Sequence, residues 1–197
     1  MKSLLLVRHA ERPHIPQHVI GNDVLLTERG EKQTLLFANQ IQGHVISIRS
    51  SPIPRCLQTA KLIAMKTGFS AASVQTSQLL GDPGFIIEDG ERAWKHWQEK
   101  GHHGVNQHLL DGTSRWEGFA PLDQATKEMT QVISNSLNEA DDGVHVWITH
   151  DTILATYASR VLQERLNLDQ WPDFLGYLRV DLREHKLYFR YVKSFAP

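Results

Sequence analysis

Short apolar runs alternate along the chain with longer stretches in which apolar residues recur every three or four positions. The short runs predict buried strands and fall at 4–7, 45–48, 74–76 and 144–149. The longer stretches predict helices and fall at 28–42, 52–66, 122–137 and 152–162. Two further runs, at 176–182 and 186–192, flank a polar triplet and predict a terminal hairpin. This order predicts an α/β fold: a three-layer α/β/α sandwich with a mostly parallel central sheet.

One part of the chain, at about 82–121, breaks this alternation. It mixes tryptophan, histidine and glycine without a clear period. The stretch is long for a connection inside a compact domain, and such segments are often active-site lids. We therefore expect a single domain over 1–197 that carries an insertion or lid at about 82–121, built from short helix and loop.

Composition excludes several classes of function. The 21 lysines and arginines against 22 acidic residues leave a net charge of −1, which argues against a nucleic-acid partner. No apolar run approaches the roughly 18 residues of a membrane span, so no membrane partner is expected. The single cysteine, Cys56, rules out an internal disulfide, and with the short N-terminal apolar run it predicts a cytoplasmic protein. Oligomeric state is left open.

Charged and imidazole side chains follow three of the predicted strands. These residues are Arg8, His9, Arg12, Arg55, His150 and Asp151. Ligands of open α/β sheets bind beyond the carboxyl ends of the strands, so these side chains should meet there. Arginine forks match the oxygens of a phosphate group. The pattern predicts a site for a phosphate.

The same residue types predict covalent chemistry on phosphorus. A neutral imidazole can attack phosphorus and form a phosphohistidine, and a carboxylic acid can protonate the leaving alkoxide. Arginines can supply the positive charge, so no metal and no cofactor is expected. Histidines also occur in the irregular stretch, at positions 96, 102, 103 and 108, but without metal-ligand spacing to a carboxylate.

Three segments together resemble a known family. Segment 8–13 reads Arg-His-Ala-Glu-Arg-Pro and resembles the signature of the histidine phosphatase superfamily, which has the phosphoglycerate mutase-like fold. Segments 50–55 and 149–152 resemble its second and third motifs and follow in the same order. The resemblance implies that His9 is the phosphorylated nucleophile. It also implies a phosphate pocket of Arg8, Arg55 and His150.

The resemblance implies different proton donors for two branches of the family. Arg12 and the His150–Asp151 pair are similar to the acid-phosphatase branch, in which Arg12 would join the pocket and Asp151 would donate the proton. That branch normally has glycine where this chain has Ala10. The mutase-like branch instead takes its acid from the segment after the third strand, which offers Asp82 and Glu88. Asp151 is preferred here, with Asp82 and Glu88 as alternatives.

The sequence thus predicts a metal-independent phosphomonoesterase that works through a phosphohistidine on His9. Its partner would be a phosphorylated small molecule or a phosphoprotein. A phosphomutase, a protein phosphohistidine phosphatase and a non-catalytic phosphate-binding module are the alternatives. The substrate is not named, because its choice lies in the irregular stretch.

Overall fold

A six-stranded sheet runs through the middle of the computed structural model, which describes residues 2–16, 19 and 21–196. The strands are β1 (Lys2–Arg8), β2 (Val45–Ser50), β3 (Gln75–Thr76), β4 (Gly143–Thr149), β5 (Tyr177–Arg183) and β6 (Lys186–Val192). The helices are α1 (Glu28–Asn39), α2 (Pro54–Thr67), α3 (Gly90–Asp111), α4 (Leu122–Glu139) and α5 (Asp151–Val161). Short 3₁₀ turns lie at Ala71–Ser73, Gln78–Leu80 and Leu168–Gln170.

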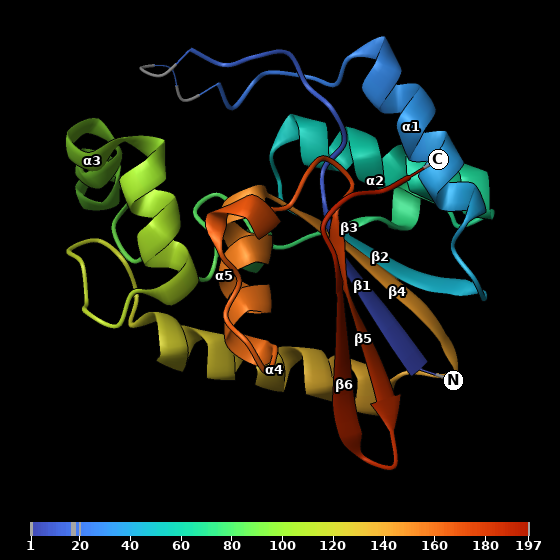
Figure 1. Cartoon of the computed structure of the whole chain (residues 1–197). Helices are drawn as coiled ribbons and strands as arrows, with labels where there is room; N and C mark the ends of the chain where they lie inside the picture. Colours follow the sequence, from blue (N-terminus) through green and yellow to red (C-terminus); the bar gives the residue numbers. More distant parts are fainter. Residues whose placement is uncertain (1, 17–18, 20, 197) are drawn as a thin grey trace.

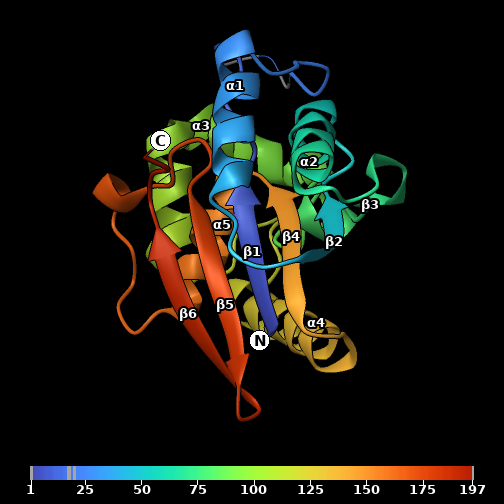
Figure 2. The same cartoon turned by 90° about the vertical axis from the view of Figure 1, so that its right-hand side faces the viewer.

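The strand order is β3-β2-β4-β1-β5-β6. Neighbours among β3, β2, β4 and β1 pair in parallel, whereas β5 is antiparallel to both β1 and β6. In Figure 2 the arrows of β1, β2 and β4 point toward the same end of the molecule. The mostly parallel sheet and the terminal hairpin are therefore confirmed, and the carboxyl ends of three strands share one edge.

Both faces of the sheet are covered by helices. On β1, Leu5 and Val7 pack into a cluster with residues of α1 and α2, while Leu4 and Leu6 pack into a cluster with residues of α4 and α5. Side chains alternate across a strand, so a run of four apolar residues is what two buried faces require. Figure 1 shows α1 and α2 on one side of the sheet and α4 on the other. The three-layer sandwich is confirmed.

The helix ends follow the local sequence. Thr27 caps α1, because its Oγ1 accepts a hydrogen bond from the backbone N–H of Gly30 at 3.0 Å. α2 begins with Pro54 and ends at Thr67, and the left-handed backbone of the next residue, Gly68 (φ 77°), closes the helix. None of the helices in the described part of the chain is long and apolar enough to cross a bilayer.

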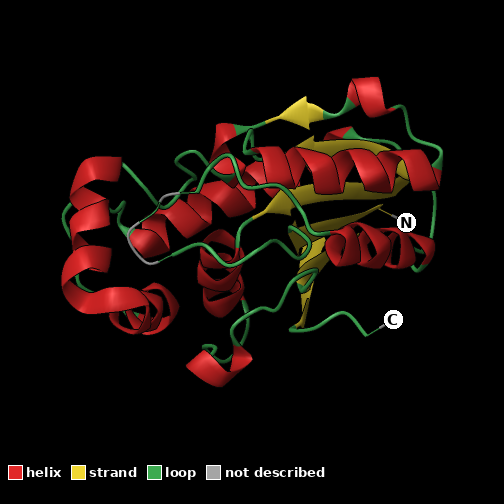
Figure 3. Cartoon of the chain, turned by 90° about the horizontal axis from the view of Figure 1, so that it is seen from above, coloured by secondary structure: helices red, strands yellow, loops and turns green. Residues whose placement is uncertain are grey.

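The irregular stretch contains more helix than its sequence predicts. α3 extends over 22 residues and is interrupted at Gly101, where φ is 65° and ψ is 178°. The break changes the direction of the helix, so no single period extends through the segment. α3 lies at one end of the molecule, on the side of α5 away from the sheet (Figures 1 and 3). It packs with Phe119, Leu122 and Ile153 in a third apolar cluster.

Gly30 allows α1 to approach the segment that follows β1. A Cβ at this position would lie 2.2 Å from the carbonyl oxygen of Glu11, a backbone atom that cannot move aside alone. We expect Gly30→Ala to lower the free energy of unfolding by about 1–3 kcal/mol, as overpacking does. Gly90→Ala is the control, because a Cβ there meets nothing within 4 Å. Equal stability of the two variants in urea unfolding would contradict this close contact.

Candidate active site

His9 is the first residue beyond β1 and is 2% exposed. Its backbone N–H donates to the carbonyl oxygen of Thr149 at 2.9 Å, which holds it at the shared edge of the sheet. Its ring Nδ1 lies 2.8 Å from the carbonyl oxygen of Ala10 and must donate to it. Arg55 donates from Nε to the ring Nε2 at 3.1 Å. These partners fix the tautomer, with the lone pair on Nε2.

The surroundings of His9 keep its imidazole neutral. Burial is the main cause that lowers its pKa well below the usual value, and the neighbouring His150 and Arg8 lower it further. A buried ring beside positive charge loses free energy when it takes up a proton. His9 therefore presents an unprotonated nitrogen at neutral pH.

Arg55 lies between the two histidines. It belongs to the first turn of α2 and is 8% exposed. Besides its bond to His9, its Nη1 donates to the carbonyl oxygen of Gly21 at 2.9 Å, and its Nη2 lies 3.5 Å from Nδ1 of His150. The ring centroids of His9 and His150 are 5.5 Å apart. Two segments after parallel strands thus meet around one guanidinium group.

His150 follows β4 and is oriented by Ser51. Its Nε2 lies 3.0 Å from the hydroxyl oxygen of Ser51 and donates to it, since Nδ1 faces the Arg55 donor. Burial, followed by the charge of Arg55, lowers the pKa of His150 to about 4. Cys56 packs against this ring, and burial raises the pKa of its thiol to about 12. Cys56 is thus a core residue and not a nucleophile.

Arg8 is the last residue of β1 and is held from three sides. Its Nη2 pairs with Oδ2 of Asp151 at 3.2 Å, and its Nη1 donates to the carbonyl oxygen of Pro172 at 2.6 Å. The guanidinium carbon lies 4.2 Å from the centre of the Phe174 ring, within cation–π range. Its Nε is buried without a partner among the described residues. Arg8 is thus a positive charge held in place, and its Nε can donate one further hydrogen bond.

Asp151 is the partner of this charge. Its Oδ1 accepts from the backbone N–H of Thr152 at 2.9 Å, and its Oδ2 accepts from Nε1 of Trp171 at 3.4 Å. Burial by itself would raise its pKa, but Arg8, followed by His9 and His150, holds the pKa of this carboxyl well below its usual range. A carboxylate that stays ionised is poorly suited to donate a proton.

Arg12 lies near enough to Arg55, Asp151 and Arg8 for their charges to act on its pKa. Its Nη1 donates to the carbonyl oxygen of Pro13 at 2.8 Å, and its Nε is buried without a partner among the residues described. Burial, followed by the charge of Arg55, lowers its pKa. Arg8, Arg12 and Arg55 thus bring three positive charges together, a grouping that an anion would stabilise.

The two other acids named from the sequence lie in different places. Asp82 is exposed at a left-handed position (φ 61°) and lines a cavity of about 250 Å³ together with Arg55 and His150. Glu88 is also exposed and pairs with Arg115 at 2.5 Å, outside the lining of that cavity. Asp82 is therefore beside the site, and Glu88 is engaged elsewhere.

Three contacts of the site were not found from the sequence. Phe174 covers Arg8 and lies 5.8 Å from the His9 ring, Pro172 accepts from Arg8, and Trp171 donates to Asp151. They belong to a segment before β5 that has no apolar period, and its proximity to β1 follows from strand pairing. Among the residues that the structure describes, no group of three or more histidine, cysteine or acidic side chains is arranged to hold a metal ion.

Two solved phosphatase structures share this fold. Phosphoserine phosphatase of Entamoeba histolytica, in complex with 3-phosphoglyceric acid, superposes with a TM-score of 0.69 at 20% identity over 98% of both chains. A mycobacterial glucosyl-3-phosphoglycerate phosphatase gives a TM-score of 0.61 at 17% identity over 96% of both chains. These likenesses confirm the phosphoglycerate mutase-like fold. Among proteins with curated descriptions, none matches the sequence significantly.

A family model assigns the chain itself. The model of the histidine phosphatase superfamily (branch 1) matches residues 4–181, a range that contains all three motifs. Arg12 and the His150–Asp151 pair are similar to residues of the acid-phosphatase branch, but this similarity does not assign the chain to that branch. With this match, and with the two histidines and Arg55 in contact at one edge of the sheet, the chain belongs to the histidine phosphatase superfamily, branch 1.

Proposed function

We propose that the protein is a metal-independent phosphomonoesterase that works through a covalent phosphohistidine on His9. The observation that carries the proposal is the unprotonated Nε2 of a neutral imidazole, whose lone pair accepts a hydrogen bond from Arg55 that a phosphoryl group would replace. Such a nitrogen is a nucleophile at neutral pH. The surrounding arginines supply the charge stabilisation that a phosphoryl group needs during transfer.

In the first step, Nε2 of His9 attacks phosphorus while the phosphorus–oxygen bond to the alcohol breaks. The electron pair of that bond goes to the alcohol oxygen, which takes a proton from a carboxylic acid. In the second step, water attacks phosphorus and gives a proton back to the same carboxylate. The nitrogen–phosphorus bond breaks, its electrons return to Nε2, and inorganic phosphate leaves.

The phosphoryl oxygens would be bound by Arg8, Arg12, Arg55 and His150. The three arginines already converge, and both Arg8 and Arg12 have a buried Nε without a partner among the described residues. Phosphoryl oxygens provide several acceptors for such donors. His150 is neutral, because its pKa is lowered to about 4, and its one N–H, on Nε2, would exchange the Ser51 hydroxyl for a phosphoryl oxygen.

We assign the proton donor to Asp82, although the sequence pattern favoured Asp151. Asp151 is paired with Arg8 and kept ionised, so its role would be to hold that arginine. Asp82 lines the cavity beside Arg55 and His150 and has no arginine partner among the ion pairs of the described residues. Its place in the lining puts its carboxyl on the side of the phosphoryl site where an alcohol oxygen could leave, which is the position that a general acid needs.

We expect a phosphohistidine on His9 when the enzyme is mixed with p-nitrophenyl phosphate. The reaction is quenched in alkaline denaturant, because phosphohistidine hydrolyses in acid, and the labelled peptide is located by mass spectrometry. His9→Ala should remove the label and slow turnover at least about a thousandfold. His44→Ala, an exposed histidine before β2, is the control.

Two outcomes would contradict this intermediate: full turnover by His9→Ala, or a label on another residue. The same assay separates the alternatives. Conversion of a phosphorylated polyol into its positional isomer, with little inorganic phosphate released, would indicate a phosphomutase. Turnover of phosphohistidine peptides alone would indicate a protein phosphohistidine phosphatase. Phosphate binding without any turnover would indicate a binding module.

The proton donor can be tested with leaving groups of different basicity. Asp82→Asn should slow hydrolysis of propyl phosphate about 10²–10⁴-fold and that of p-nitrophenyl phosphate much less, because nitrophenolate leaves without a proton. Asn also accepts the left-handed backbone at this position. Asp151→Asn should slow both esters by similar factors, because Arg8 loses its partner. Glu88→Gln is the control.

The opposite effects of the two variants would change the residue assigned as proton donor. If Asp151→Asn slows propyl phosphate far more than p-nitrophenyl phosphate, and Asp82→Asn slows neither, Asp151 is the donor.

His9 and His150 should remain neutral under mildly acidic conditions. At pH 6 an ordinary histidine, with a pKa of about 6.5, is about three quarters protonated. Burial and the arginine charges lower both pKa values, so both rings should keep neutral-state NMR shifts at this pH. Nitrogen shifts of labelled histidine should show Nδ1 protonated in His9. A titration midpoint of 6.5 or higher for the signal lost in His9→Ala would contradict this.

A further inference from the structure

The cavity beside Arg55 and His150 has a wall that the proposed chemistry does not use. Most of this wall is apolar and comes from α3, from the segment before it and from the starts of α2 and α5. Its large apolar side chains are Ile53, Ile86, Ile87, Trp94, Trp97 and Ile153. Ligand pockets of this composition bind through apolar and aromatic contact.

Two tryptophans form the α3 side of the wall. The rings of Trp94 and Trp97 lie 6.2 Å apart at an interplanar angle of 26°. Both are partly exposed, so part of each ring is open to a ligand. Trp97 is fixed from behind by Phe119, at 5.4 Å between ring centres. The wall is thus a supported aromatic surface.

Few of the side chains that line the cavity can carry a charge. Among the described residues that line it, the ionisable side chains are Arg55, Asp82 and His150, all of which serve the proposed phosphoryl transfer. The arginines near α3 are engaged outside: Arg92 pairs with Glu117 at 2.8 Å, and Arg115 pairs with Glu88. The apolar wall offers no cation to a second anionic group.

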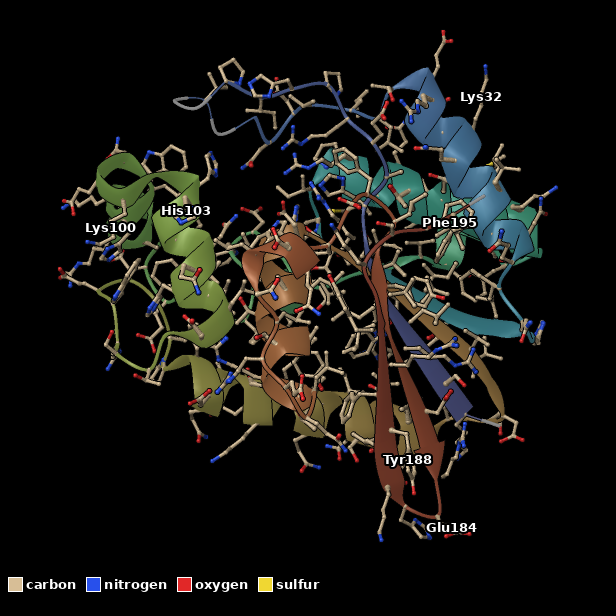
Figure 4. All side chains as sticks on the ribbon, viewed as in Figure 1. Lys32, Lys100, His103, Glu184, Tyr188 and Phe195 are labelled. Atoms are coloured by element: carbon tan, nitrogen blue, oxygen red, sulfur yellow. The ribbon has the colours of Figure 1, made fainter. Side chains whose placement is uncertain are left out.

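The basic residues farther along α3 are also outside the cavity. Lys100 and His103 are exposed and do not belong to its lining. Figure 4 shows both on α3, at the opposite side of the molecule from Tyr188 and Glu184 of the hairpin. They leave the apolar character of the wall unchanged.

We propose, on the basis of the proposed phosphomonoesterase, that this cavity binds the alcohol part of the substrate and that this part is uncharged and contains an aromatic ring. The cavity of about 250 Å³ is slightly smaller than the roughly 300 Å³ at which small-molecule pockets begin. It therefore suits one ring on a short linker. Phosphate esters with a carboxylate on the alcohol would bring a second anion into a lining whose one arginine or lysine among the described residues, Arg55, is taken by the phosphoryl group, which is costly.

The test compares two esters whose alcohols are leaving groups of similar basicity. Phenethyl phosphate and propyl phosphate differ mainly in the ring. We expect kcat/KM for phenethyl phosphate to be at least about tenfold higher, because the ring buries apolar area against the tryptophans. Phosphoserine, which carries a carboxylate, should be the slowest of the three.

Variants of the two tryptophans test whether the wall causes the preference for the aromatic ester. Trp94→Ala and Trp97→Ala should each reduce the ratio of the two kcat/KM values at least about threefold, and Trp94→Phe should retain most of it. Lys95→Ala is the matched control, since this side chain is exposed on the same turn and absent from the lining. An unchanged ratio in both alanine variants would overturn the assignment of the wall.

A binding measurement separates this inference from the proposed function. Phenethylphosphonate and propylphosphonate cannot be hydrolysed, and their dissociation constants can be measured by quenching of tryptophan fluorescence. At least about tenfold tighter binding of phenethylphosphonate supports the subsite, whether or not any ester is hydrolysed. If no ester is hydrolysed, only the proposed phosphomonoesterase is rejected. Equal binding of the two phosphonates, or faster hydrolysis of phosphoserine than of phenethyl phosphate, would overturn the subsite and leave the phosphomonoesterase standing.

Discussion

The hydrogen bond from Nε of Arg55 to Nε2 of His9 is the interaction on which the site depends. It joins residues 46 positions apart in the chain and sets the histidine tautomer. A buried guanidinium is costly unless its donors are satisfied. Here the acceptors are one imidazole nitrogen from each of two strand ends and a carbonyl oxygen at Gly21. The free site is therefore held together by the groups that would bind and attack a phosphoryl group.

A second set of contacts holds the other side of the site. Arg8 is fixed by Asp151, by the carbonyl oxygen of Pro172 and by the face of Phe174. Without a bound anion, three arginine charges near one another are unfavourable, and one carboxylate offsets only part of this repulsion. In the proposed enzyme, a phosphoryl group would supply the remaining negative charge. That negative charge would offset the repulsion among the arginines, and the same arginines would stabilise the charge that moves during transfer.

Chemistry and selectivity would come from different parts of the fold. The residues around His9 follow the strands and rest on the two main apolar clusters, whereas most of the apolar wall (Ile86, Ile87, Trp97 and Ile153) belongs to the third cluster. Substitutions in the α3 cluster can alter the wall while the strand ends keep their hydrogen bonds. This separation agrees with the general observation that one fold supports many specificities.

Local sequence patterns determined the strands, the layers and the family of this protein. The apolar runs predicted the strands and the layers, because a strand buried on both faces must be apolar throughout, as β1 is. The motifs around His9, Arg55 and His150 predicted the family, and the carboxyl-end rule predicted where they meet. Tertiary structure alone decided which of the two acids, among the described residues, pairs with an arginine. Asp151 and Asp82 differ in their neighbours, and the Arg8 that holds Asp151 comes from 143 residues earlier in the chain. The α3 wall and the contacts of Phe174 also depend on packing between distant segments, which no local period records.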